Sequence, residues 1–496
     1  MRERVTFVHP VGAWADDDEL PEVRESGLLG PHLDTAREDR LTIPIDELPT
    51  DLKTTFQDFH HVSIRWASPL AYDTVEPFGS RLSPGLHVIY TPSDETQDHT
   101  NIIYSLLTTL GLECSLGPES SIRIDTSRSS NLPSFYYYQA LEDLQSFIKT
   151  ATLSFCPKLD SICKARVRGL LNVASLDALF DRQSKTLKVT VFSPLMAQKI
   201  SVASSTHHRV EVGIFTKGEP AQLRPHDLGI SGLLTVLGES ETPSPTLFSF
   251  PARHRLSAAS FSSQFIVPTG LHPTLQLRIS SNKPPVEDGE CHLYTHLTLP
   301  KTFFADRYQL ADKLFLASKN LTTLRYSSLP MDLEAPAYTT DTWGSSVLLE
   351  LAPPKTTSSE AWTAEVPLHL RYLAPSASGY VEVGLPYPVL FWACSADNAI
   401  DFANNPFDRV HLGYDTLFDP NTVFWHATPS PVVGSRLMNQ IHVPVLKGET
   451  ASWVGSGTAL AVALGFAWVL WKIMAAYSKD GHGGSLRTQN SKKKTQ

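Results

Sequence analysis

The sequence predicts a mainly β protein, in which a β-sandwich-like domain follows a second domain of α+β or β-rich type. Two observations predict the strands: short segments alternate apolar and polar residues, and Gly, Pro and Asn turns separate them. A third observation adds one transmembrane helix, because residues 450–471 carry no charge and a helix of about 20 apolar residues crosses a bilayer. The 449 residues before that helix are enough for two domains at roughly 100–200 residues each.

The N-terminal part is expected to contain a loosely structured segment and then a first domain. Residues 1–60 are rich in proline and acidic residues and are assigned to the loose segment, and residues 61–240 are assigned to the domain. Apolar spacing predicts one helix around residues 141–148 and a second near residues 176–180. Period-two alternation predicts strands at residues 86–90, 122–124, 187–191 and 210–212.

A Pro- and Ser-rich passage, residues 241–256, is expected to be a linker to the next domain, residues 257–448. The strand pattern is stronger in this second domain, and short intervals between strands are typical of an antiparallel sandwich or barrel. The predicted strands are residues 275–279, 293–299, 347–351, 366–370 and 381–383.

The predicted transmembrane helix, residues 450–472, has tryptophans near both ends. Trp453 and Trp471 are 18 residues apart, which separates them by ~27 Å along a helix, as expected for interfacial aromatic residues. A buried helix of a soluble core is the alternative, and the length and lack of charge argue against it.

The flanking charges predict the orientation of this helix. The tail, residues 473–496, and Lys472 together carry six basic residues against one acid, so the tail is expected in the cytosol and the headpiece in the lumen. Lys493 and Lys494 stand fourth and third from the end, which is the dilysine pattern that returns membrane proteins to the endoplasmic reticulum (ER). The net charge of −9 gives no polybasic surface and argues against a nucleic-acid partner.

Two features bear on this orientation in opposite ways. The first 20 residues contain no apolar run of seven or more, so they do not form an ordinary signal peptide, and a tail-anchored protein with a cytosolic headpiece would share that property. In favour of the lumen, Asn320, Leu321 and Thr322 form a sequon for N-glycosylation at Asn320. Five cysteines without a zinc spacing allow one or two disulfides in an oxidising lumen, with Cys156–Cys163 and Cys291–Cys394 as candidate pairs.

Candidate chemical motifs were weighed against plainer explanations. The acidic residues Asp16 to Glu19 contain an Asp-x-Asp pattern but lie in a polar segment, where a solvated turn is favoured over a metal site. His292 and His296 lie in a predicted strand, where four residues span ~13 Å, too far for one ion. No HExxH, phosphate-loop or dinucleotide motif is present. The sequence therefore predicts no catalytic, cofactor-binding or metal-binding residues.

The predicted membrane helix carries small residues at a spacing of four. Gly455, Ala459 and Ala463 form one such row, Gly457, Ala461 and Gly465 form another, and such rows let a second helix approach closely. A generic Ala-rich anchor is an equally good explanation, and the row Gly455, Ala459 and Ala463 is the candidate interface with another membrane protein.

The second domain resembles the PIG-X family, and the whole chain resembles its fungal branch, the protease B non-derepressible (PBN) proteins. The resemblance covers roughly 180 residues from about Leu271 to the membrane helix, and it is carried by a small set of segments. They are CHLYTHLTLPKTFFADRYQL from Cys291, DLEAPAY from Asp332, VPLHLRYLAPSASGYVEVGLPYPVLFWAC from Val366, NPFDRVHLGYDTLFDPNTVFWH from Asn405, and VPVLKGE before the helix.

This resemblance implies a non-catalytic subunit of glycosylphosphatidylinositol (GPI) mannosyltransferase I, which adds the first mannose to the GPI precursor in the ER lumen. The implied partner is a multi-spanning catalytic subunit of the PIG-M type, and a chaperone-like role for other lumenal proteins is also implied. Residues 369–372 and 386–392 are candidates for the surface that faces that partner, and ordinary core strands are at least as good an explanation of both segments. The alternative function is a membrane-tethered lumenal hydrolase.

Overall fold

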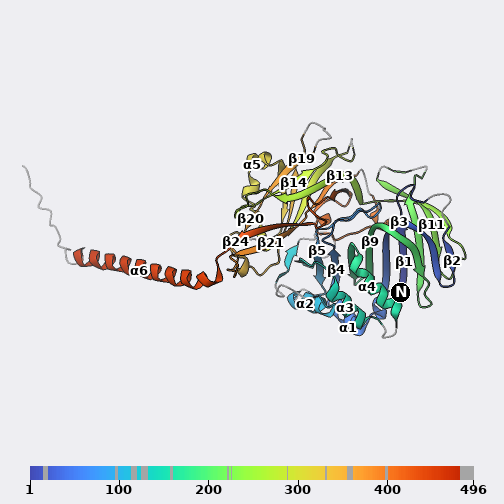
Figure 1. The fold of residues 1–496 in the computed structure, drawn as a ribbon, viewed down its shortest axis with the longest axis horizontal. Coiled ribbons are helices and arrows are strands. Elements are labelled where there is room, and N and C mark those ends of the chain that lie inside the picture. Colours follow the sequence, from blue (N-terminus) through green and yellow to red (C-terminus); the bar gives the residue numbers. More distant parts are fainter. Residues whose placement is uncertain are drawn as a thin grey trace, which may run out of the picture. The chain divides into compact units, whose positions relative to one another are not determined.

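The computed structural model describes residues 1–14, 20–94, 99–112, 120–124, 132–156, 160–220, 223–224, 226–286, 289–329, 332–354, 361–396 and 400–480. The chain forms two compact units. The first unit comprises Met1–Tyr372 and Val383–Ile441, and the second comprises Leu373–Glu382 and the chain from His442 onward. The expected mainly β architecture is confirmed (Figure 1).

Within the described residues, twelve strands of the first unit form one large sheet. Neighbouring strands are antiparallel except for β1 and β10, which are parallel. The order is β12 (Ser244–Pro251), β11 (Asp227–Val236), β10 (Arg209–Lys217), β1 (Arg2–Val8), β3 (Gly27–Pro44), β9 (Thr186–Ala203), β8 (Ser175–Asp181), β4 (Phe59–Ala67), β5 (Gly85–Pro92), β7 (Ser134–Gln139) and β6 (Ile122–Ile124), with β2 (Glu22–Arg24) paired to β3.

The expectation of a loosely structured segment over residues 1–60 is wrong, because β1 and β3 lie in the middle of this sheet. The polar composition of β3 is compatible with a strand because its charged side chains pair two residues apart along the same face. Arg37 Nε lies 2.7 Å from Asp39 Oδ1, and Arg40 Nη2 lies 2.9 Å from Glu38 Oε1. Composition alone therefore concealed a long ordered strand.

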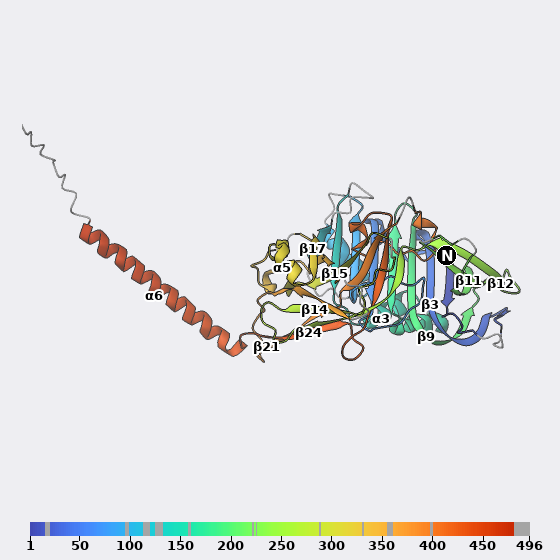
Figure 2. The same ribbon diagram turned by 90° about the horizontal axis from the view of Figure 1, so that it is seen from above.

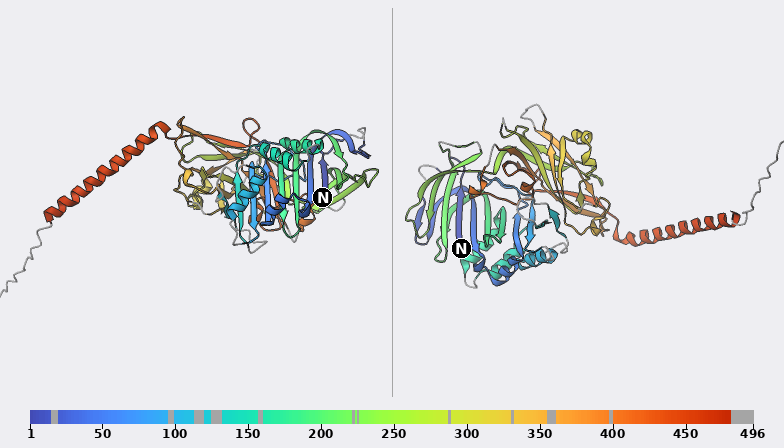
Figure 3. Two further views of the ribbon diagram at one scale, coloured as in Figure 1. Left: turned by 90° about the horizontal axis from the view of Figure 1, so that it is seen from below. Right: turned by 180° about the vertical axis from the view of Figure 1, so that it is seen from behind.

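Four helices cover one face of the large sheet: α1 (Thr50–Gln57), α2 (His99–Thr109), α3 (Gln145–Ser154) and α4 (Ser161–Gly169). Leu52 and Phe56 of α1 and Leu106 of α2 share a buried cluster with Val62 and Val88 of the strands beneath them. Figure 3 shows these helices lying across the strands.

The two predicted helices had different outcomes. The helix expected over residues 141–148 begins later, at Gln145, as α3. The helix expected near residues 176–180 is wrong, because this segment is β8, paired between β4 and β9. A short apolar run cannot be assigned to helix or strand by periodicity alone.

The eight-stranded sheet of the first unit contains the strands expected at residues 275–279, 293–299 and 347–351 and the first residues of 366–370, whereas residues 369–370 and the strand expected at 381–383 lie in separate two-stranded sheets. Helix α5 (Lys313–Ser318) lies beside its edge strand β17 (Figure 2), and a short pair is formed by β16 (Phe303–Phe304) and β20 (His369–Leu370). The order is β17 (Leu321–Ser327), β18 (Gly344–Leu351), β15 (Cys291–Pro300), β22 (Val389–Ser395), β23 (Thr422–Pro429), β13 (His254–Phe265), β14 (Thr274–Ile279) and β19 (Trp362–Pro367).

The predicted linker, residues 241–256, is not a linker. It contains β12, at the edge of the large sheet, and the first residues of β13, which belongs to the eight-stranded sheet. An edge strand tolerates proline because one of its sides needs no ladder hydrogen bonds. The chain therefore passes between the sheets within one compact unit.

The second unit contains the long helix α6 (Gly448–Asp480), the residues just before it, and the turn Leu373–Glu382, which comes earlier in the sequence. Strands β21 (Tyr380–Pro386) and β24 (Met438–Pro444) pair with each other. The Ser376 amide donates to the Leu446 carbonyl at 3.1 Å, and the Gly448 amide donates to the Ser376 carbonyl at 3.0 Å. These hydrogen bonds anchor the first residues of the helix to the 373–382 turn.

Candidate functional site

Helix α6 is the first candidate site, because its apolar side chains have no cover in the described chain. Within Gly448–Ser478, the most apolar 18 residues have a mean hydropathy of 1.9, and none of them is buried. A β-carbon added at Gly455, Gly457 or Gly465 would meet no atom within 4 Å. The row Gly455, Ala459 and Ala463 is thus open to a second helix, and its use as an interface stays a prediction.

The second candidate site is the segment 405–415, which the resemblance singled out and which lies between the two sheets. Arg409 is its central residue: its Nε lies 3.4 Å from Asp177 Oδ2 of β8 and its Nη2 lies 3.8 Å from Glu38 Oε2 of β3. Arg40 donates to the carbonyl of Pro406, and Arg65 donates to the carbonyl of Val410. Charged side chains of the large sheet thus bind this segment along its length, and we call the arrangement the seam.

The eight-stranded sheet holds the same segment through histidines. His254 Nε2 donates to the Arg409 carbonyl at 2.9 Å, and its Nδ1 accepts a hydrogen bond from His426 Nε2 at 3.0 Å. Asp415 closes the segment by accepting from the amides of His411 and Leu412, at 2.8 and 2.9 Å. The seam therefore connects the sheets through residues that are hundreds of positions apart in the sequence.

Burial sets the protonation states in the seam. It lowers the pKa of His254 to about 3, with Asp415 opposing the shift, so this ring is neutral at pH 7. It raises the pKa of Asp408 to about 6, although Arg253 Nε lies 3.4 Å from that carboxylate and opposes the shift. Burial would lower the pKa of Arg409, but Asp177 and Glu38 more than offset it and the pKa is raised. A charge network this enclosed is suited to holding the fold together.

Several predicted site residues lie in plain structural settings. Asn320 is exposed at the turn between α5 and β17, where its φ of 55° is left-handed and its Nδ2 donates to the Thr363 carbonyl at 2.8 Å. Glycosylation of Asn320 stays a prediction. Lys493, Lys494 and the acidic residues Asp16 to Glu19 lie outside the described residues.

His292 and His296, whose predicted strand spacing is too wide for one metal ion, lie on strand β15, as expected. His292 Nδ1 lies 3.1 Å from Glu350 Oε1, whereas the buried His296 bonds Ser346 Oγ through Nε2 at 2.8 Å. Within the described ranges, no group of three or more His, Cys, Asp or Glu side chains is arranged to hold a metal ion.

The expected partner-facing surfaces need correction. Residues 386–392 do not form a surface. Tyr387 is buried just before β22, and Phe391, within β22, packs in the core. In residues 369–372, Tyr372 is exposed but Arg371 is buried. Apolar and aromatic composition indicated contact, and it could not separate contact with a partner from contact with the chain's own core.

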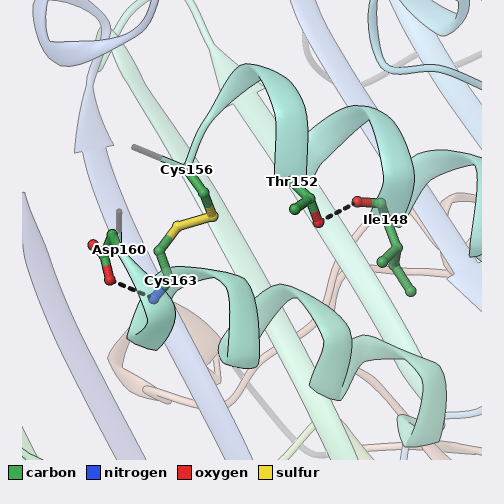
Figure 4. The surroundings of a disulfide bond; sticks show 5 residues. All are labelled: Ile148, Thr152, Cys156, Asp160 and Cys163. Carbon is green, nitrogen blue, oxygen red and sulfur yellow. Dashed lines mark hydrogen bonds between the residues drawn. A yellow bond between two sulfur atoms is a disulfide. The ribbon is translucent and has the colours of Figure 1, made fainter. Parts of the chain in front are cut away.

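Both candidate disulfides are present in the first unit. Cys291 and Cys394 face each other in register on the antiparallel pair β15 and β22. Cys156, after α3, is bonded to Cys163 in α4, whose N-terminus is capped by Asp160 through a 2.9 Å hydrogen bond to the Cys163 amide (Figure 4). Disulfides persist in oxidising compartments, so this unit carries chemistry typical of a lumenal or extracellular domain.

These features define a class of protein: a β-rich, disulfide-bonded headpiece with one helix that is long and apolar enough to cross a membrane. Comparison with known proteins gives the family. The family model PIG-X / PBN1 matches residues 268–474. Protein PBN1 of Gibberella zeae is 52% identical over 100% of this chain and 99% of its own length. The chain belongs to the PIG-X / PBN1 family.

Other relatives agree along the whole length. Protein pbn1 of Neurospora crassa is 47% identical over 97% of both chains, and that of Aspergillus fumigatus is 39% identical over 99% of this chain and 98% of its own. The family names support involvement in GPI-anchor biosynthesis. Among solved structures, the T6 backbone pilin of serotype M6 Streptococcus pyogenes aligns at a TM-score of 0.15 and 9% identity, which is too weak a likeness for any argument.

Proposed function

We propose that this chain is a non-catalytic subunit of GPI mannosyltransferase I, which adds the first mannose during GPI-anchor biosynthesis in the ER. In this proposal it binds and stabilises a multi-spanning catalytic subunit of the PIG-M type. A chaperone-like role for other ER proteins is part of the same proposal.

The observation that carries this proposal is the uncovered helix α6 on a member of the PIG-X / PBN1 family. A transferase acting on lipid-linked substrates needs a cavity at the membrane, and one helix cannot enclose it. One helix can instead dock beside a larger membrane protein, with small residues allowing close van der Waals packing. A subunit that binds only the folded partner stabilises that partner by mass action.

The proposed orientation places the headpiece in the ER lumen and the C-terminus in the cytosol. The basic residues after the helix favour the cytosol for the tail. The two disulfides of the headpiece support an oxidising compartment on the other side. Lys493 and Lys494 supply the proposed ER retrieval signal.

The test compares two single substitutions in α6 that make the same chemical change on opposite sides of the helix. Ala459→Phe places a bulky ring in the row with Gly455 and Ala463, and Ala461→Phe is the matched control, because two residues turn a helix by about 200°. Tagged full-length chains are purified from cells and the catalytic subunit is quantified by mass spectrometry. We expect its recovery to fall several-fold with Ala459→Phe and to stay unchanged with Ala461→Phe.

Equal recovery of the catalytic subunit with both variants would show that this face of α6 is not part of the interface. Failure to recover a multi-spanning GPI mannosyltransferase subunit with the unsubstituted chain would contradict the proposed function itself.

A further inference from the structure

A polar pocket of about 210 Å³ opens in the first unit beside strand β16, where β15 ends and β18 begins. Its lining combines the cations Lys301 and Arg371 with hydroxyl side chains and two carboxylates. The volume is below the roughly 300–1,000 Å³ of sites that enclose drug-sized ligands. The pocket thus fits a small polar group and not a nucleotide or a lipid chain.

Arg371 is buried but lacks an anionic partner. Only 7% of its surface is exposed, and among the described residues no carboxylate lies within ion-pair distance of its guanidinium. The side chain is held in place: Nη1 donates to the Ala335 carbonyl at 2.8 Å and Cζ lies 4.7 Å from the centre of the Phe304 ring. Burial lowers the pKa of Arg371, with Asp332 opposing the shift, yet arginine remains charged in proteins. A fixed cation whose carboxylate neighbour lies beyond ion-pair distance keeps the capacity to bind an anion directly.

Lys301 is the second cation of the pocket. It is half-buried, donates to the Thr340 carbonyl at 3.3 Å and keeps further ammonium hydrogens for a ligand. Ser345 also lines the pocket, but its Oγ is enclosed beneath the lining and offers a ligand no accessible donor. An anion with several acceptor oxygens would satisfy Lys301 and Arg371 at once.

The arrangement of charge across the pocket indicates the rest of the ligand. Arg371 and Ser345 are buried, whereas the carboxylates of Asp332 and Asp341 are exposed at the rim. Carboxylates repel an anion at the rim but accept hydrogen bonds from hydroxyl or ammonium groups. The ligand that matches this pattern carries a phosphate at one end and a hydroxylated ring at the other.

We propose that the pocket lined by Lys301 and Arg371 binds the phosphate of a phosphorylated polyol or sugar head group, with the ring directed toward Asp332 and Asp341. Guanidinium and ammonium groups together are a common way to bind phosphate. The assignment to a membrane lipid head group, such as that of an inositol phospholipid, rests on the proposed function, whereas the phosphate chemistry rests on the pocket alone.

The test measures binding to the full-length chain in detergent by calorimetry, with inositol 1-phosphate, inorganic phosphate and myo-inositol as probes. We expect inositol 1-phosphate to bind most tightly. Arg371→Met and Lys301→Met should each weaken its binding about tenfold, because a charged hydrogen bond is lost. Arg278→Met, which removes an exposed arginine of β14, is the charge-matched control and should bind as the unsubstituted chain does.

Three results would overturn the proposal: no binding of inositol 1-phosphate, equal binding by all four proteins, or inorganic phosphate binding as tightly as inositol 1-phosphate. Lys301→Met keeps the test decisive if Arg371→Met does not fold, because the half-buried Lys301 gives up one long hydrogen bond to a backbone carbonyl. Nanodiscs with phosphatidylinositol are then compared with phosphatidylcholine nanodiscs for competition with the soluble probe. Competition by phosphatidylinositol assigns a lipid source, and its absence assigns a soluble phosphorylated sugar or polyol.

This test can fail separately from the proposed function. If the probe does not bind but the catalytic subunit is recovered, the proposed ligand pocket is wrong and the subunit role stands. If the probe binds but that subunit is not recovered, the proposed function is wrong and the phosphate site stands.

Discussion

Two buried arginines of the first unit show opposite electrostatic designs. In the seam, Arg409 lies between Asp177 and Glu38, and its third contact is a 3.2 Å hydrogen bond from Nη1 to Ser175 Oγ. In the pocket, Arg371 has a carbonyl and an aromatic ring as neighbours and no carboxylate in ion-pair range within the described ranges. The Arg409 side chain is 13% exposed and Arg371 as a residue is 7% exposed, so solvent exposure does not explain the contrast.

The two arginines differ in the groups that neutralise their charge. Arg409 is neutralised by the chain itself, so its role ends with holding the two sheets and the 405–415 segment together. Arg371 is positioned as carefully but left uncompensated, as expected of a residue that meets an anion from outside. Removing Arg409 should therefore lower mainly the stability of the fold, whereas removing Arg371 should weaken mainly the binding of an anion.

The largest expected effect is on the seam. Arg409→Met should lower the free energy of unfolding by about 3–5 kcal/mol, because it removes the shared counterion of two buried carboxylates. The measurement is thermal or urea unfolding of the full-length chain in detergent. Arg278→Met is the control and should change the free energy by less than about 0.5 kcal/mol. A loss below about 1 kcal/mol for Arg409→Met would show that Arg40 and Arg65 suffice for those carboxylates.

Acid should also lower the stability of the first unit. Burial lowers the pKa values of His87, His254 and His296 to about 3, 3 and 4, from 6.5 in the unfolded chain. Between those values the unfolded chain binds more protons, so the free energy of unfolding decreases as the pH falls below about 6.5. Each histidine should cost about 2 kcal/mol at pH 5. The raised pKa of Asp408 acts in the opposite direction between about 4 and 6, but on one group only.

The measurement is the melting temperature at pH 7 and pH 5. His296→Gln should reduce the difference, because it removes one titrating group, whereas the half-exposed His292→Gln should not. A melting temperature that is equal or higher at pH 5 would contradict neutral buried histidines.

The smallest effects on stability are expected in the pocket. Arg371→Met loses one hydrogen bond and a ring contact without exposing a bare carboxylate, so we expect a loss of about 1–2 kcal/mol in the free energy of unfolding. Ser345→Ala should stay within about 0.5 kcal/mol of the unsubstituted chain. If Arg371→Met destabilises as much as Arg409→Met, the contrast between the two arginines fails and Arg371 is structural.

The sequence was most informative where burial is local. Alternation correctly placed β14, because one of its faces packs on a core and its burial alternates every two residues. It also placed β5 and β15, although nearly all residues of these two strands are buried. It failed for β3, whose charges pair along the strand, and for β8, whose apolar run is too short to distinguish helix from strand. The Pro- and Ser-rich passage was misassigned because an edge strand tolerates residues typical of a linker.

By itself, the sequence determined the helix that is long and apolar enough to cross a membrane, the mainly β class, the two candidate cysteine pairs and the family resemblance. Only the tertiary structure decided which charges are paired. Glu38 and Arg409 are 371 positions apart in the chain, and Arg371 is distinguished by having no carboxylate within ion-pair distance among the described residues. Charge compensation depends on three-dimensional distance in a poorly polarisable interior, and no one-dimensional pattern records that distance.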